Sequence, residues 1–265
     1  MQGFLNNNYY LISLGVIIVA MVPFVVSFEG RKPQAREIVL IAVLIALAVV
    51  SRAAFFMIPQ FKPIAALVII SGVALGPQSG FMIGALSAFV SNFLFGQGPW
   101  TPWQMFALGI IGALAGALFA KTQRDGSFMS SSQPAPAVAA PPELSPGLTA
   151  ASSESSPRLT AAPPEASPRL MKRRSVDRRR LTQLCVFGGI SVLVLYGLLA
   201  DTASAMIFTA TLNLPTLLTV YAAGLPFNAV FAGSTVLFLL LLARPMLEKL
   251  ERVKKKYGLL RQHPG

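Results

Sequence analysis

Long stretches without any ionisable side chain constrain this chain more than any other feature of its sequence. Asp, Glu, Lys, Arg and His are all absent from residues 1–28, 38–51, 63–120, 181–200 and 202–243. A helix needs roughly 20 apolar residues to cross the hydrocarbon core of a bilayer, so the longest stretch must cross more than once. A soluble protein would need amphipathic helices to cover so much apolar sequence, and none is evident. The pattern predicts an all-α membrane protein.

The apolar runs divide into six expected transmembrane helices preceded by one more. The first run, 9–28, is expected to be a retained helix, kinked or ended near Pro23, because the first basic residue, Arg31, follows it and does not precede it as in a signal peptide. The second and third bundle helices are short for a span, so we expect them to tilt or to end within protein. The six bundle helices are expected at 38–58, 63–76, 80–95, 103–120, from 181 past 201, and 227–243.

The basic residues indicate how the chain is oriented in the membrane. If the N-terminus is outside and each helix crosses once, then 29–37, 121–180 and 244–265 are cytoplasmic, and they hold 20 of the 22 Lys and Arg residues. Only Arg52 and Lys62 fall outside. Because cytoplasmic segments are enriched in Lys and Arg, we expect a multi-pass protein of the cell membrane with its C-terminus in the cytoplasm. The net charge of +12 therefore predicts contact with membrane lipid and no nucleic-acid partner.

Residues 202–224 are apolar enough to form another span, but Pro215, Gly224 and Pro226 interrupt this region. A further span would also place the basic C-terminal tail outside the cell, whereas Lys and Arg are enriched in cytoplasmic segments. We therefore expect 209–224 to be an external loop, with or without a short lid helix.

A Pro-, Ala- and Ser-rich segment, residues 121–180, contains the unit Ser-Pro-x-Leu three times, starting at 145, 156 and 167. Such a segment buries too little apolar surface to offset its ordering entropy, so a disordered cytoplasmic linker is expected. The predicted organisation is an extra N-terminal transmembrane helix at 1–30, bundle helices one to four in 35–120, the linker in 121–180, helices five and six in 181–243, and a basic cytoplasmic tail in 244–265.

Several kinds of chemistry are disfavoured by the residues that are missing. No Gly-x-x-x-x-Gly-Lys-Ser/Thr sequence occurs, so the chain has no phosphate-binding loop with which to use ATP. The only histidine, His263, lies in the tail, and Cys185 is the only cysteine. Asp201 is the one acidic residue at or near membrane depth, which leaves no paired carboxylates. We expect no catalytic residue, no metal site and no cofactor.

The most informative motif is Gly-Gln-Gly-Pro-Trp-Thr-Pro-Trp-Gln at residues 96–104, the Trp-Pro loop. Indole rings stack on flat ligands and amides fix their orientation, although Trp residues also form aromatic belts at membrane interfaces. Further polar groups lie on the same predicted outer side, where Asp201 either binds a ligand or pairs with Arg52 or Lys62. The candidate substrate-binding residues are Gln60, Lys62, Asn92, Gln97, Trp100, Trp103, Gln104, Asp201 and Asn228.

These pieces together resemble the substrate-binding S-component of energy-coupling factor (ECF) vitamin transporters over roughly residues 35–121 and 181–260. The matching pieces are Arg36-Glu37-Ile38 leading into Ala42-x-x-x-Ala46, Lys62-Pro63, residues 80–92, the Trp-Pro loop, residues 197–201 and residues 224–258.

The resemblance implies a six-helix bundle that binds a vitamin on its outer side. It also implies two kinds of partner, a transmembrane coupling subunit and two cytoplasmic ATPases, and it places Ala42 and Ala46 against the coupling subunit. The Trp-Pro loop is most similar to the cobalamin or corrinoid branch. The metal-ion branch uses a histidine near the N-terminus, which this chain lacks, so nickel or cobalt is not expected.

The sequence therefore predicts the substrate-capture subunit of an ECF-type importer for a small vitamin, cobalamin or a corrinoid precursor, with ATP hydrolysis confined to partner subunits. Two alternatives remain open at this point. One is an ion-coupled secondary transporter of a small solute, and the other is a membrane scaffold without a transport function.

Overall fold

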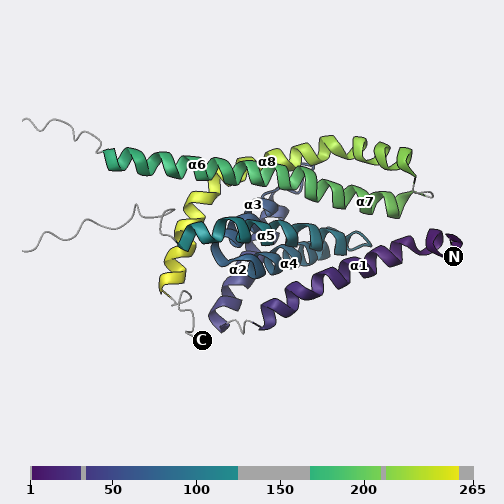
Figure 1. Cartoon of the computed structure of the whole chain (residues 1–265), viewed down its shortest axis with the longest axis horizontal. Helices are drawn as coiled ribbons and strands as arrows, with labels where there is room; N and C mark the ends of the chain where they lie inside the picture. Colours follow the sequence, from purple (N-terminus) through teal and green to yellow (C-terminus); the bar gives the residue numbers. More distant parts are fainter. Residues whose placement is uncertain (1, 31–33, 125–167, 210–212, 257–265) are drawn as a thin grey trace, which may run out of the picture.

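The regular structure of the protein is helical (Figure 1). The computed structural model describes residues 2–30, 34–124, 168–209 and 213–256. No β-strand occurs within these ranges. In chain order the elements are α1 (Gln2–Gly30), α2 (Ala35–Ala54), α3 (Ile64–Leu75), α4 (Pro77–Phe95), α5 (Thr101–Arg124), α6 (Pro168–Ile190), a π-helical segment η1 (Ser191–Tyr196), α7 (Gly197–Phe208) and α8 (Leu214–Lys256).

Five helical segments within the described ranges are long and apolar enough to cross a membrane. They are Ala35–Ala54, Pro77–Phe95, Thr101–Phe119, Arg178–Phe208 and Leu214–Lys254. Two apolar segments are shorter, Ile17–Gly30 in α1 and Ile64–Leu75, which is α3. The all-α membrane class is thus confirmed. The predicted six-helix bundle corresponds to α2, α3, α4, α5, the continuous α6–η1–α7 unit and α8, with α1 as the added helix.

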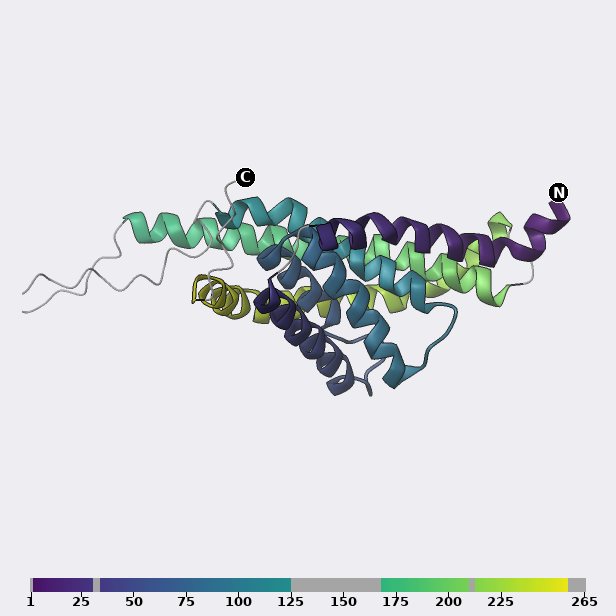
Figure 2. The ribbon, with the colours of Figure 1, turned by 90° about the horizontal axis from the view of Figure 1, so that it is seen from below.

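The long elements flank the shorter helices. In Figure 1, α6 and α7 form one rod beside the first half of α8, and α2 to α5 lie between this layer and α1. Figure 2 shows that α2 and the end of α4 extend away from α1. The start of α1 and the end of α8 lie at opposite ends of the molecule (Figure 1).

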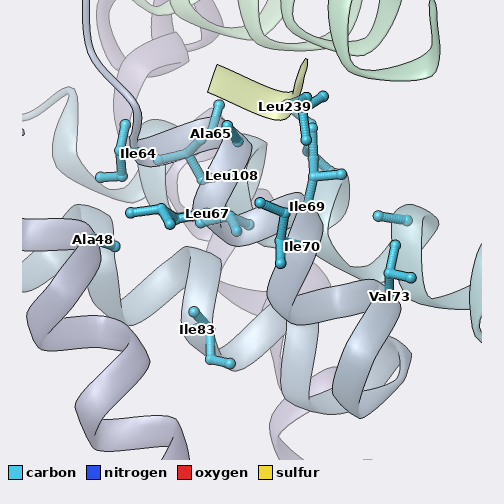
Figure 3. Packing of buried hydrophobic residues seen from close by; sticks show 14 of the residues in the cluster. Ala48, Ile64, Ala65, Leu67, Ile69, Ile70, Val73, Ile83, Leu108 and Leu239 are labelled. Carbon is cyan, nitrogen blue, oxygen red and sulfur yellow. The ribbon is translucent and has the colours of Figure 1, made fainter. Parts of the chain in front are cut away.

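The core is built around α3, whose residues 64–74 are all buried. This helix is apolar on every face, as expected for a helix surrounded by protein. Figure 3 shows its side chains between Ile83 of α4, Leu108 of α5 and Leu239 of α8. Because every side of α3 is covered, its short length does not expose its ends to lipid, as the sequence predicts.

Glycines bring the backbones of α3, α4 and α5 into direct contact. A Cβ atom built on Gly112 of α5 would collide with the backbone oxygen of Gly80, and one on Gly72 or Gly80 would collide with the backbone oxygen of Gly112. Small residues allow such close approach, which gives membrane helices their van der Waals attraction. These glycines therefore serve packing within the bundle.

Helix α1 lies against α4, α5 and α7. The ring of Phe24 stacks on Phe81 of α4, with centroids 4.1 Å apart and the planes 9° from parallel. Ile17 and Met21 pack in the same cluster as Trp103. The helix continues through Pro23 to Gly30, so Pro23 does not end it.

The expected external loop at 209–224 is wrong for most of its length. Residues 214–224 form the first turns of α8, a single helix of 43 residues. Asn213 begins this helix, because its side-chain Oδ1 accepts a hydrogen bond from the backbone N–H of Thr216 at 2.9 Å. Pro215 lies in the first turn, where a missing N–H has no cost. Pro215, one of the residues that predicted a loop, therefore lies at the start of a helix.

Two further prolines, Pro226 and Pro245, lie inside α8 and do not end it. Neighbouring helices make such prolines tolerable in membrane helices. At 1.5 Å per residue α8 is roughly 65 Å long, about twice the thickness of a bilayer core. Its last turns run steeply away from its first half and across the end of the bundle (Figure 1). There the Nζ of Lys254 donates to the backbone oxygen of Ala74 at 2.5 Å, near the C-terminus of α3.

Helix also extends into both ends of the predicted linker, to Arg124 in α5 and from Pro168 in α6. The remainder, residues 125–167, lies outside the described residues. The third bundle helix, expected at 80–95, is α4 and begins earlier than expected, because Pro77 occupies its first helical position. With this added turn it is long enough to cross a membrane, so the expectation that it is short for a span is wrong.

We predict that Gly112→Ala lowers the thermal unfolding midpoint of the protein in detergent. The added methyl group would push α5 away from α3 and α4, and overpacking of this kind costs about 1–3 kcal/mol. Gly233→Ala is the matched control, since a Cβ atom on Gly233 of α8 meets nothing within 4 Å. Equal midpoints for the two variants would contradict the packing described here.

Candidate functional site

The α4–α5 loop (residues 96–100) is held by a network of hydrogen bonds centred on Asn92. This side chain is 1% exposed. Its Nδ2 donates to Thr101 Oγ1 at 3.1 Å and to Gln104 Oε1 at 3.0 Å. Its Oδ1 accepts from Arg52 Nη1 at 2.9 Å. All of the polar atoms of Asn92 are therefore engaged within the protein.

Gln97 also takes part in shaping the loop. Its Oε1 accepts a hydrogen bond from Thr101 Oγ1 at 2.9 Å, and its Nε2 donates to the backbone oxygen of Phe89 at 3.1 Å. Thr101 Oγ1 additionally accepts the backbone N–H of Gly98 at 3.3 Å. The sequence predicts a rigid loop here, and the structure supplies the bonds that would make it rigid.

The two Trp residues lie in different surroundings. Trp100 is half-buried and folds back onto Gly98, where a Cβ atom would come within 2.5 Å of its ring. Trp103 is 6% exposed and packs against Ile17 of α1 and Ala203 of α7. The indole nitrogen of Trp103 has no hydrogen-bond partner among the described residues. Trp100 is thus the one placed on the loop surface, whereas Trp103 joins the loop to α1 and α7.

Asp201 and Asn228 form a second polar group, between α7 and α8. Asn228 Nδ2 donates to Asp201 Oδ2 at 2.8 Å. The next residue of α7, Thr202, has its hydroxyl hydrogen-bonded to that of Tyr221 in α8 at 2.8 Å. Gly224 allows this approach, because a Cβ atom there would collide with the Asp201 carboxylate. Asp201 therefore bonds to an amide and not to Arg52 or Lys62.

Lys62 lies at the end of the α2–α3 loop (residues 55–63), above the core. Its Nζ is 4.8 Å from the centroid of the Phe231 ring, a cation–π contact. Its backbone N–H and C=O both lie 3.4 Å from the hydroxyl of Ser234. Gln60, two residues before Lys62, has a φ of 58°. This left-handed conformation is uncommon for residues other than glycine. The loop thus fixes where Lys62 lies.

The predicted residues include two hydrogen-bonded groups, the Asn92 network and the Asp201–Asn228 pair, and Gln60 and Lys62 belong to neither. Two residues outside the prediction lie beside these side chains. Arg52, at the end of α2, donates hydrogen bonds to Ser91 and Asn92, and its positive charge contributes to the lowered pKa of Lys62. Tyr196, the last residue of η1, is buried and packs edge-on against Phe231, the ring that Lys62 contacts.

Arg52 and Tyr196 are missing from the predicted binding residues. Arg52 has a signal in the sequence, since it is the only charge in the first bundle helix beyond its start. Tyr196 has none, because its position depends on the π-helical turn. Such turns are rare and often occur at functional sites.

Ala42 and Ala46 lie at the surface on one side of α2. The side chains around them are also exposed and apolar, among them Val39, Val43 and Val50. This side of α2 therefore faces lipid or another membrane helix.

We predict that Lys62 makes the stability of the protein pH-dependent. Burial, with a smaller contribution from the charge of Arg52, lowers the pKa of Lys62 from 10.5 to about 7. Between these two values the unfolded chain binds more protons than the folded one, so stability should rise as the pH rises from about 7 to about 10.5.

Thermal unfolding in detergent across this range measures the effect, and Lys62→Met should flatten the rise. Lys249→Met, at an exposed position in the last turns of α8, is the control and should keep it. The assignment fails if the Lys62→Met profile matches that of the unmodified protein.

Comparison with known proteins gives one family match. Residues 32–134 match the model of a family described as ECF-type riboflavin transporter, S component. No curated protein and no solved structure matches the chain. The matched segment contains α2 to α5 and both loops that hold Lys62 and the Asn92 network. The match supports the resemblance to an S-component, and it does not extend to the cobalamin branch. From α2 to α5, this chain is similar to the S component of ECF-type riboflavin transporters.

Proposed function

We propose that the protein is the substrate-capture subunit of an ECF-type importer and binds a small vitamin. The observation that supports this most directly is the family match, because it covers the helices whose connecting loops hold the candidate site. In this proposal the ligand binds at the loop end of the bundle, among the α2–α3 loop, the α4–α5 loop and the α7–α8 pair. Binding itself needs no energy source, and ATP hydrolysis by partner subunits reorients the loaded bundle.

The proposed orientation places the α2–α3 and α4–α5 loops outside the cell. Its support is the distribution of charge, with 20 of the 22 Lys and Arg residues on the opposite side. The start of α1 and the last turns of α8 also lie at opposite ends of the molecule (Figure 1). The N-terminus is then outside and the C-terminus in the cytoplasm.

Riboflavin is the first ligand to test, because the matching family is named for it. Cobalamin or a corrinoid precursor, suggested by the Trp-Pro loop, is the second. Both have large flat ring systems that suit an indole surface. Of the two Trp residues, Trp100 is the better placed to contact such a ring, since Trp103 is buried beneath α1.

The proposed partners are a transmembrane coupling subunit and two cytoplasmic ATPases. The exposed side of α2 around Ala42 and Ala46 is the proposed contact with the coupling subunit. Two small residues four apart allow a partner helix to approach closely. ATPase partners are required by the proposal, because the chain contains no phosphate-binding loop with which to use ATP.

We predict that the purified protein binds a vitamin without ATP and does not accumulate it in vesicles on its own. Mass spectrometry of small molecules that co-purify identifies the ligand, and fluorescence quenching measures its affinity. The chain has two Trp residues, so Trp103→Phe leaves only Trp100 as reporter and Trp100→Phe leaves only Trp103. Because Trp100 is the residue expected to contact the ligand, the ligand should quench the fluorescence of Trp103→Phe more than that of Trp100→Phe.

Accumulation by the protein alone, abolished by a proton uncoupler, would instead support an ion-coupled secondary transporter. A protein that retains neither a ligand nor ATPase partners would support a scaffold role. Either result excludes the capture function proposed here.

We also predict that Ala46→Trp prevents co-purification of the coupling subunit while leaving ligand affinity unchanged, because a large side chain keeps the partner helix at a distance. Co-purification from membranes of the source cell measures this. Ala117→Trp, at another exposed alanine on α5, is the matched control and should leave assembly intact. If the two variants behave alike, the α2 side is not the contact.

A further inference from the structure

Two cations at the loop end of the bundle have hydrogen-bond donors that the protein does not use. A guanidinium has five N–H donors and an ammonium has three. Both hydrogen bonds of Arg52 to described residues come from one nitrogen, Nη1, to Ser91 at 2.6 Å and to Asn92 at 2.9 Å. The Nζ of Lys62 makes no hydrogen bond to a described residue, and its contact is with the face of Phe231.

Aromatic rings and backbone contacts hold both cations in place. The guanidinium of Arg52 lies 4.8 Å from the centroid of the Phe95 ring. Lys62 is placed by Phe231 and by the contacts of its backbone with Ser234. Phe231 also packs against Tyr196 at 4.9 Å. Cations fixed in this way lose little further side-chain freedom when a ligand binds.

No carboxylate in the described part of the chain balances these charges. Besides burial, the positive charge of Arg52 contributes to the lowered pKa of Lys62. Asp201, the acidic residue on the same predicted side, accepts a hydrogen bond from Asn228. Partly buried charges of like sign without a counter-ion are costly, and an anion placed between them would offset that cost.

We propose that Arg52 and Lys62 form an anion-binding subsite, which takes a carboxylate or phosphate group of the captured vitamin. The inference rests on the proposed capture function and narrows its ligand from vitamins in general to those with an acidic group. The free Nη2 and Nε of Arg52 offer the planar fork that suits both carboxylate and phosphate oxygens. Lys62, whose protonated form a bound anion favours, adds a point charge from the end of the α2–α3 loop.

The test compares ligands that differ only in the acidic group. The full-length protein in nanodiscs is titrated with three matched pairs: flavin mononucleotide and riboflavin, pantothenate and pantothenol, biotin and biotinamide. A charge-assisted hydrogen bond is worth about 1.5–3 kcal/mol, so the anionic member of the pair that binds should bind at least about 10-fold more tightly. Lys62→Gln should weaken binding of the anionic member more than binding of the neutral member, and so remove most of this preference.

Lys249→Gln, an exposed lysine in the last turns of α8, is the control and should change neither affinity. Equal or tighter binding of the neutral member would overturn the subsite. So would a preference for the anion that survives in Lys62→Gln.

A second measurement separates this subsite from the capture function. If none of the six compounds binds, these vitamins are excluded as ligands, and the subsite is tested with inorganic pyrophosphate. Pyrophosphate should raise the thermal midpoint of the unmodified protein, relative to chloride of equal ionic strength, and should not raise that of Lys62→Gln. The absence of a difference between these two proteins would overturn the subsite as well.

Discussion

Direct contact between the backbones of α3, α4 and α5 is the interaction on which the rest of the structure depends. Lipid tails are as apolar as the helices, so helices in a membrane gain little from hiding apolar side chains from one another. Close packing must then supply the attraction, and glycine is the residue that permits it. Gly72, Gly80 and Gly112 lie where any Cβ atom would meet backbone. The α3–α4–α5 contact therefore sets the distance between the loops that emerge from these helices.

Some polar side chains of the candidate site have all of their hydrogen-bonding atoms paired within the protein, and others do not. Asn92, Gln97 and Thr101 form hydrogen bonds within one network, which gives the α4–α5 loop a single shape. Asp201 and Asn228 satisfy each other between α7 and α8. Arg52 and Lys62 differ, because each retains N–H donors and neither forms an ion pair with a carboxylate of the described residues. A ligand that binds here gains most from the groups that the protein leaves unsatisfied.

The added helix α1 packs on the bundle and changes the surroundings of the Trp-Pro loop. Its Phe24 stacks on Phe81, and its Ile17 lies against Trp103. One of the two indoles of the Trp-Pro loop is thereby enclosed between α1, α5 and α7. In the sequence the two Trp residues appear equivalent, and only the position of α1 makes one of them a packing residue.

Much of the fold follows from the sequence because a bilayer allows few alternatives. Uncharged runs of sufficient length must be helices, since every backbone N–H and C=O in lipid needs a partner within its own helix. This constraint predicts α2 to α5 and the α6–η1–α7 unit, and it predicts that α3 is short and enclosed. The prediction fails at residues 214–224, where Asn213 and Pro215 suit a turn and a helix start equally well. Local chemistry does not choose between the two, whereas packing against α7 does.

What the sequence by itself determined was the membrane class, the number of bundle helices and the list of polar residues that remain near one end. What only the tertiary structure decided was which of these residues meet. The sequence suggests a ligand, Arg52 or Lys62 as the partner of Asp201, but Asp201 bonds to Asn228, because Gly224 brings α8 close to α7. Arg52 reaches α4 across about forty residues of chain. Composition and spacing fix the periodicity of each helix, but the rotation of one helix against another depends on side chains that are distant in the sequence.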